Sequence, residues 1–123
     1  MSNRNCLSSA DLIAAARNAT GLEDFGEPAL SPVFERMIQA INEEGRLSER
    51  GAAGRAQHIV HLLSNRLRLV DLLRRRPELK DAPLGRPVVI VGLPRSGTTK
   101  MQRMLARDEC FNTVMTWECL SPV

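Results

Sequence analysis

The stretch "VVIVGLPRSGTTK", residues 88–100, begins with four apolar residues and ends in a glycine-rich segment with hydroxyl side chains. Val88–Val91 is apolar at every position, which is typical of a central parallel strand that is covered on both faces. Gly92 allows a sharp turn, and Gly97 allows the backbone to approach an anion closely. We therefore predict a strand, a loop and then a helix over Thr99–Arg107, the arrangement in which N–H groups at a helix N-terminus bind phosphate.

The loop also carries polar side chains that suit an anion. Ser96, Thr98 and Thr99 supply hydroxyl donors, and Arg95 adds a guanidinium at the rim. A glycine turn with Ser and Thr as helix caps is the simpler alternative. A nucleotide-binding Walker loop would carry Lys where this chain has Thr98. We therefore predict that the loop holds a single terminal phosphate better than the triphosphate of Mg-ATP.

Residues 1–84 are predicted to form a mainly α-helical amino-terminal segment. Caps and helix breakers place three helices, from Ser8 or Ser9 to Gly21, from Pro32 to Gly45, and from about Ser48 to Arg75. The third helix should turn an apolar stripe inward, formed by Ile59, Leu62, Leu63, Leu67, Val70 and Leu73.

Residues 85–123 are predicted to begin a P-loop-type α/β domain with a three-layer parallel sheet. A second short strand is expected over Thr113–Thr116. One strand and its helix cannot make a stable parallel sheet, because both strand edges need neighbours. We therefore expect this domain to be incomplete, and an oligomer to form through the exposed edge of the first strand.

The composition is that of a globular protein with few aromatic residues. The 123 residues are 43% hydrophobic and 25% charged but only 3% aromatic, which disfavours base stacking and specific nucleic-acid binding. Three cysteines without a CxxC pair indicate neither a disulfide framework nor a zinc site, and favour a reducing cytoplasm. No apolar run approaches the roughly 20 residues that span a bilayer, so no transmembrane segment is predicted.

Positive charge is concentrated in the third predicted helix. Eight arginines lie between Arg46 and Arg76, where Glu49 and Asp71 are the acidic residues, and the whole chain has a net charge of +3. Arginine suits the recognition of phosphate, sulfate and carboxylate groups. A solvated helix face is the simpler interpretation of such a charge run.

The segment "GLPRSGTT" after an apolar run resembles the phosphosulfate-binding loop of sulfotransferases that use 3′-phosphoadenosine 5′-phosphosulfate (PAPS), which commonly reads P-[KR]-[ST]-G-T-T. The resemblance extends back through "AARNATGLEDFG" and "NRLRLVDLLRRRPEL" and forward to "TWE", residues 116–118. Together these segments resemble the amino-terminal third of a bacterial-type sulfotransferase, over nearly the whole chain.

The resemblance implies roles for the loop residues. Ser96, Gly97, Thr98 and Thr99 would bind the 5′-phosphate of the donor, and Arg95 would contact its bridging oxygen and stabilise the charge that develops there. The sulfuryl group would pass to a hydroxyl or amine of an unidentified small-molecule acceptor. No metal is implied.

The acceptor must also lose a proton, and Glu118 is the candidate general base. A surface glutamate at a loop edge fits this residue at least as well. Two departures from the family pattern stand out: Lys100 occupies a position that is usually apolar or aromatic, and the family's 3′-phosphate site has no counterpart up to Val123. We therefore expect a chain that is complete at its amino end only and inactive by itself.

Two other functions fit the same residues. A P-loop kinase or another nucleotide-binding relative would share the α/β fold and would require Mg-ATP. A non-enzymatic helical interaction module would use the arginine-rich helix, with the loop serving no binding role.

Overall fold

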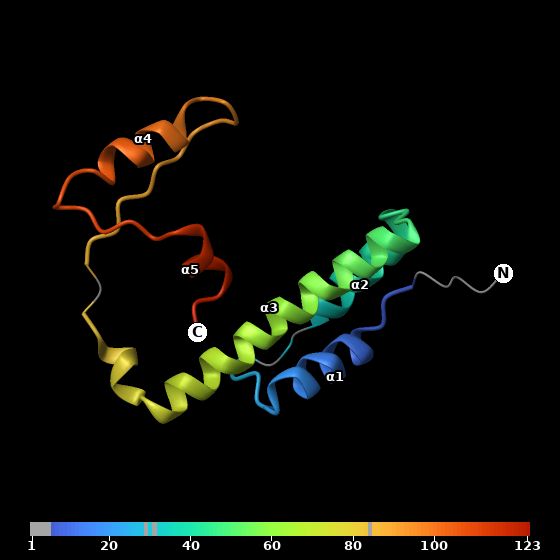
Figure 1. Cartoon of the computed structure of the whole chain (residues 1–123). Coiled ribbons are helices and arrows are strands. Elements are labelled where there is room, and N and C mark those ends of the chain that lie inside the picture. The colour runs from blue at the N-terminus through green and yellow to red at the C-terminus, as the bar shows by residue number, and fades with distance from the viewer. Residues whose placement is uncertain (1–5, 29, 31, 84) are drawn as a thin grey trace. The chain divides into compact units, whose positions relative to one another are not determined.

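The computed structural model describes residues 6–28, 30, 32–83 and 85–123. The chain forms two compact units, one reaching to Lys80 and the other spanning Asp81–Pro122, and each is considered by itself. The elements in chain order are α1 (Ser9–Thr20), α2 (Pro32–Glu44), α3 (Glu49–Arg75), the 3₁₀ helix η1 (Pro77–Asp81), α4 (Thr98–Leu105) and α5 (Thr116–Leu120) (Figure 1).

Local capping signals set the ends of the helices in the first unit. The Ser8 hydroxyl accepts a hydrogen bond from the Asp11 N–H and caps α1, which ends where Gly21 takes a left-handed conformation with φ 69°. In α3 the Ser48 hydroxyl accepts from the Gly51 N–H at 3.2 Å. The three helices predicted for this segment are therefore confirmed, with ends that differ from the prediction by about one residue.

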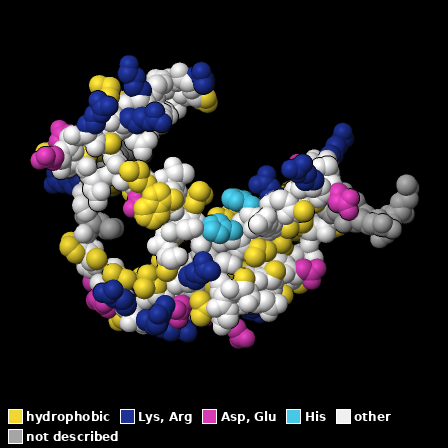
Figure 2. Space-filling model, viewed as in Figure 1, with side chains coloured by type: hydrophobic (Ala, Val, Ile, Leu, Met, Phe, Trp, Pro, Cys, Tyr) yellow, Lys and Arg dark blue, Asp and Glu magenta, His cyan; other side chains and the backbone are white. Residues whose placement is uncertain are grey.

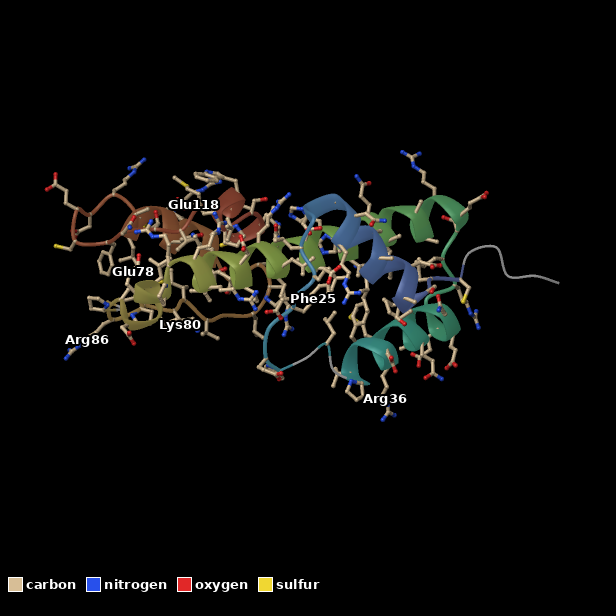
Figure 3. All side chains as sticks on the ribbon, turned by 90° about the horizontal axis from the view of Figure 1, so that it is seen from below. Phe25, Arg36, Glu78, Lys80, Arg86 and Glu118 are labelled. Carbon is tan, nitrogen blue, oxygen red and sulfur yellow. The ribbon has the colours of Figure 1, made fainter. Side chains whose placement is uncertain are left out.

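The core of the first unit lies where α1, α2 and α3 meet. Its buried members are Leu12, Ala16, Phe25, Ile38, Ile59, Leu63 and Leu67. Phe25 comes from the loop that follows α1 (Figure 3), and its carbonyl accepts a hydrogen bond from Arg66 Nε at 2.7 Å. The predicted stripe of α3 is confirmed at its centre but is wrong at Leu62, which remains 49% exposed.

We expect Leu67→Ala to be the most damaging single truncation in this unit. The Leu67 side chain is completely buried, so its removal leaves a cavity and should lower the free energy of unfolding by about 2–5 kcal/mol. Leu62→Ala removes the same atoms from a half-exposed site in the same helix, and should lower it by under about 1 kcal/mol. Urea unfolding of the two variants measures the difference, and equal losses would contradict the position of the core.

Half of the arginines in the charge run are engaged inside their own unit. Arg66 donates to the carbonyls of Phe25 and Pro28. The other three pair with carboxylates, Arg74 with Asp24, Arg75 with Asp71 and Arg76 with Glu78. The contacts of Arg66 and Arg74 link α3 to the loop after α1. The pair of Arg76 with Glu78 links the carboxyl end of α3 to η1. The arginine-rich helix therefore has a structural role, which weakens the case for an interaction module.

The predicted parallel sheet is wrong, because the described residues contain no strand. Val88–Val91 has no regular secondary structure, and Val88, Val89 and Val91 are 62%, 75% and 88% exposed. A strand is held by backbone hydrogen bonds to a neighbouring strand, and no such neighbour is present within residues 81–83 and 85–122. The apolar composition of residues 88–91 is therefore compatible with a strand, but these residues form none here. The strand edge through which an oligomer was expected to form is consequently absent from the described residues.

The second predicted strand is also wrong. Residues 113–115 are irregular, and Thr116 begins α5 instead. The Glu118 carboxylate accepts a hydrogen bond from the Met115 N–H at 2.6 Å, which satisfies a donor at the start of this helix. The local cap therefore accompanies a helix at Thr116, although Thr113 and Val114 are residues that favour strands.

Within the described part of the chain, every helix is too short or too polar to cross a lipid bilayer.

Candidate phosphate-binding loop

The loop before α4 has a backbone conformation that few residues adopt. Arg95 and Gly97 both have positive φ, 68° and 89° respectively. The turn is closed by the Ser96 N–H, which donates to the Leu93 carbonyl at 3.2 Å. A left-handed arginine is uncommon, and such strain is concentrated at functional sites. Arg95 is thus held in a left-handed backbone conformation at the tip of the loop.

Gly92 is required by close packing inside the loop. A Cβ atom at this position would lie 2.6 Å from Ser96 Oγ and 2.8 Å from Thr98 Cγ2. The Ser96 side chain therefore folds back against the Gly92 backbone. A larger residue at position 92 would therefore displace the side chains of Ser96 and Thr98.

We expect Gly92→Ala to weaken anion binding by roughly tenfold or more, because relieving the clash would displace Ser96 and Thr98 at an expected cost of about 1–3 kcal/mol. Gly85→Ala is the matched control in the same unit, since a Cβ atom there would have no neighbour within 4 Å. Calorimetric titration with adenosine 3′,5′-bisphosphate compares the two variants. Equal affinity for both would show that the packing of the loop is irrelevant to binding.

The N-terminus of α4 is open. Gly97 is its N-cap residue and offers no side-chain hydrogen bond, while the Gly97 carbonyl accepts from the Met101 N–H at 3.0 Å. The N–H groups of the first turn, at residues 98–100, consequently keep their donor capacity. A Cβ atom at Gly97 would find no neighbour within 4 Å, so the space beside this glycine is free. Donors, helix dipole and free space together favour an anion at this end.

A cavity of about 640 Å³ opens beside the loop and runs along α4. It is lined by Arg95, Gly97, Thr98, Thr99, Lys100, Arg103, Met104 and Arg107. Four of these residues are cationic and none is acidic. Figure 2 shows Lys and Arg side chains gathered over the surface that α4 forms. The cavity is therefore suited to a ligand with more than one negative charge.

The structure brings together four of the five donor-site residues predicted from sequence. Arg95, Gly97, Thr98 and Thr99 all line the cavity, whereas Ser96 faces Gly92 instead.

Three further cavity residues, Lys100, Arg103 and Arg107, were missed by sequence reasoning. Their spacing of three and four residues was the available signal, because it places them on one side of a helix. The family pattern points to a packing role for position 100, whereas the structure places Lys100 in the lining of the cavity.

Glu118 is half-buried on α5 (Figure 3). Its Oε2 atom accepts a hydrogen bond from the Met115 N–H. Glu118 is not one of the described residues that line the cavity beside the loop. This geometry gives Glu118 a capping role, while its role as a general base stays a prediction.

Comparison with known proteins gives one informative match. No family model and no curated protein sequence matches the chain. Among solved structures, the crystal structure of sulfotransferase STF1 from Mycobacterium tuberculosis H37Rv matches 98% of this chain with a TM-score of 0.87 and 25% sequence identity. The chain spans 33% of the length of that protein. The likeness supports a sulfotransferase-like relationship.

Proposed function

We propose that the loop at residues 92–99 binds the 5′-phosphate end of PAPS in a sulfuryl-transfer reaction. The observation that carries the proposal is the open N-terminus of α4 behind a left-handed Gly97, with Arg95 at the rim of the same cavity. The likeness to a sulfotransferase over nearly the whole chain supports this choice of phosphate ligand.

The residues of the site fit such a donor. PAPS is strongly anionic, and the cavity lining combines backbone N–H groups, two threonine hydroxyls and four cationic side chains without a carboxylate. The position of the Walker lysine is taken by Thr98, which offers a hydroxyl but no charge. Positive charge comes instead from Arg95. This residue precedes the second glycine, Gly97, and would therefore reach the ligand from a different side than a Walker lysine, which follows that glycine.

In the proposed reaction the start of α4 holds the phosphate while the sulfur–oxygen bond to it breaks. The Arg95 guanidinium donates to the bridging oxygen, which gains negative charge as the sulfuryl group leaves. A new sulfur–oxygen or sulfur–nitrogen bond forms to the acceptor, in line with the breaking bond. The acceptor proton must pass to a base, and Glu118 has a second carboxylate oxygen, Oε1, beside the one that caps α5.

We also propose that residues 1–84 and 85–123 act as separate parts, with the donor loop in the second. The loop residues from Gly92 to Gly97 are all exposed, so one side of a bound donor would stay in water, where charge stabilisation is weak. We therefore expect nucleotide binding by the 123 residues alone, but no detectable turnover. The three free, exposed cysteines suit a reducing compartment, and we propose the cytoplasm.

A chimera tests the proposed reaction. Residues 1–123 would replace the matching third of the mycobacterial sulfotransferase, and consumption of radiolabelled PAPS would be measured with and without acceptors. We expect donor consumption that depends on Arg95. A folded chimera that binds adenosine 3′,5′-bisphosphate and leaves PAPS intact would contradict a role in transfer.

A further inference from the structure

Three cationic residues continue the cavity away from the loop. Lys100 and Arg103 lie three residues apart on α4, and Arg107 follows in the turn after it, where its N–H donates to the Met104 carbonyl at 3.2 Å. All three line the cavity that Arg95 and the start of α4 also line. We call Lys100, Arg103 and Arg107 the α4 basic row. At about 1.5 Å per residue the row extends roughly 10 Å along the helix direction.

The α4 basic row has no carboxylate partner among the described residues, in contrast to Arg74, Arg75 and Arg76 in the first unit. The nearest acidic groups in the sequence are Asp108 and Glu109. Asp108 Oδ1 instead accepts from the Cys110 N–H at 2.9 Å, and that hydrogen bond holds the pKa of the Asp108 carboxyl below its usual value. The three like charges therefore repel one another, and the Asp108 carboxylate forms no ion pair with them.

A bound anion would lower the repulsion among the three positive charges of the α4 basic row. The threonine hydroxyls and the N–H groups at the start of α4 can hold one anionic group, which leaves the α4 basic row free for another. Lys100 lies in the first turn of α4, close to the first group, and Arg107 lies furthest away. The row can thus reach a second group that is separated from the first by about 5–10 Å, judged from the helical rise.

We infer that Lys100, Arg103 and Arg107 form a second anion subsite, so that the cavity takes two anionic groups side by side. This inference rests on the proposed function, because the first group is the phosphate held by the loop. The second group is a phosphate, sulfate or carboxylate. It comes either from the donor itself, which has a further phosphate, or from an acceptor that is already anionic.

Titration of the 123-residue chain with three probes tests the subsite. Adenosine 5′-monophosphate has one phosphate, adenosine 3′,5′-bisphosphate has two, and inorganic sulfate added on top of the monophosphate stands for a separate anion. The variant is Lys100→Gln with Arg103→Gln. The matched control is Arg36→Gln with Arg86→Gln, which removes the same charge from two exposed side chains that do not line the loop cavity; both are labelled in Figure 3.

We expect the row variant to lose less affinity for the monophosphate, through Lys100 in the first turn of α4, than for the second anionic group. It should lose about tenfold in affinity either for the bisphosphate, which assigns the second group to the donor, or for sulfate in the presence of the monophosphate, which assigns it to an acceptor. The control pair should keep both affinities. Unchanged affinity of the row variant for all three probes, or an equal loss in the control pair, would overturn the inference.

The backbone amide signals of Lys100 and Arg103 separate this inference from the proposed function. If the unaltered chain binds no monophosphate, the proposed function fails. Sulfate-induced shifts of these two signals would still reveal the second subsite, provided that they disappear in the row variant. Saturable monophosphate binding without any shift of these signals on addition of sulfate or of the bisphosphate would instead reject the subsite and retain the loop.

Discussion

Gly97→Asp is expected to abolish binding of adenosine 3′,5′-bisphosphate to this chain. Gly97 has φ 89°, and the space that a Cβ atom would enter is free of protein atoms, so the carboxylate would stand where the phosphate approaches. Two unit charges about 4 Å apart repel by about 4 kcal/mol near a protein surface, which corresponds to a loss of roughly 10³-fold in affinity. Calorimetric titration measures this loss directly.

The control for this variant is Gly85→Asp. It adds the same charge in the same unit, at a glycine whose Cβ would meet nothing within 4 Å and whose φ is not in the left-handed region. A second variant, Gly97→Ala, introduces the backbone strain without the charge and should lose less affinity than Gly97→Asp. A folded Gly97→Asp chain that binds the bisphosphate as before would mean that the anion is held elsewhere.

Arg95→Ala is expected to lower kcat by about 10²–10³-fold while changing KM for PAPS much less. The guanidinium is proposed to act on charge that develops only as the sulfuryl group leaves, and removal of one such donor lowers kcat by that order. The measurement is steady-state donor consumption by the chimera in which residues 1–123 replace the matching third of the mycobacterial sulfotransferase.

Arg95→Lys serves as the conservative comparison. It keeps the positive charge and the same left-handed backbone position, and we expect it to retain most of the rate. If Arg95→Ala raises KM and leaves kcat as it was, the guanidinium binds the donor in the ground state and takes no part in the chemical step.

The helices of the first unit could be predicted from sequence because their signals are local. Ser8, Gly21 and Ser48 act on backbone groups within a few residues, so short sequence windows contain the information. Exposure was less predictable. Leu62 follows the apolar period of α3 but lies at the edge of the stripe, outside the contact with α1 and α2.

The sheet could not be predicted in the same way, because a strand depends on partners that are remote in sequence. Val88–Val91 has the composition of a buried strand, yet the described part of this chain provides neither a neighbouring strand nor cover for its side chains. At the loop, by contrast, the glycine spacing predicted a turn into a helix. The α4 basic row is not evident from sequence, because the family pattern makes position 100 a packing position and the cavity that Lys100 lines is formed only by the folded loop and α4.

Metal-free binding of a nucleotide phosphate at the start of α4 is the proposal on which the others depend. Its most direct test follows the backbone amide signals of Gly97, Thr98 and Thr99 by NMR while the chain is titrated with adenosine 3′,5′-bisphosphate in the presence of EDTA, and in a separate sample with Mg-ATP. We expect saturable shifts at these three residues with the bisphosphate and none with adenosine. Shifts that require Mg-ATP, or no response of a folded chain to the bisphosphate, would contradict it.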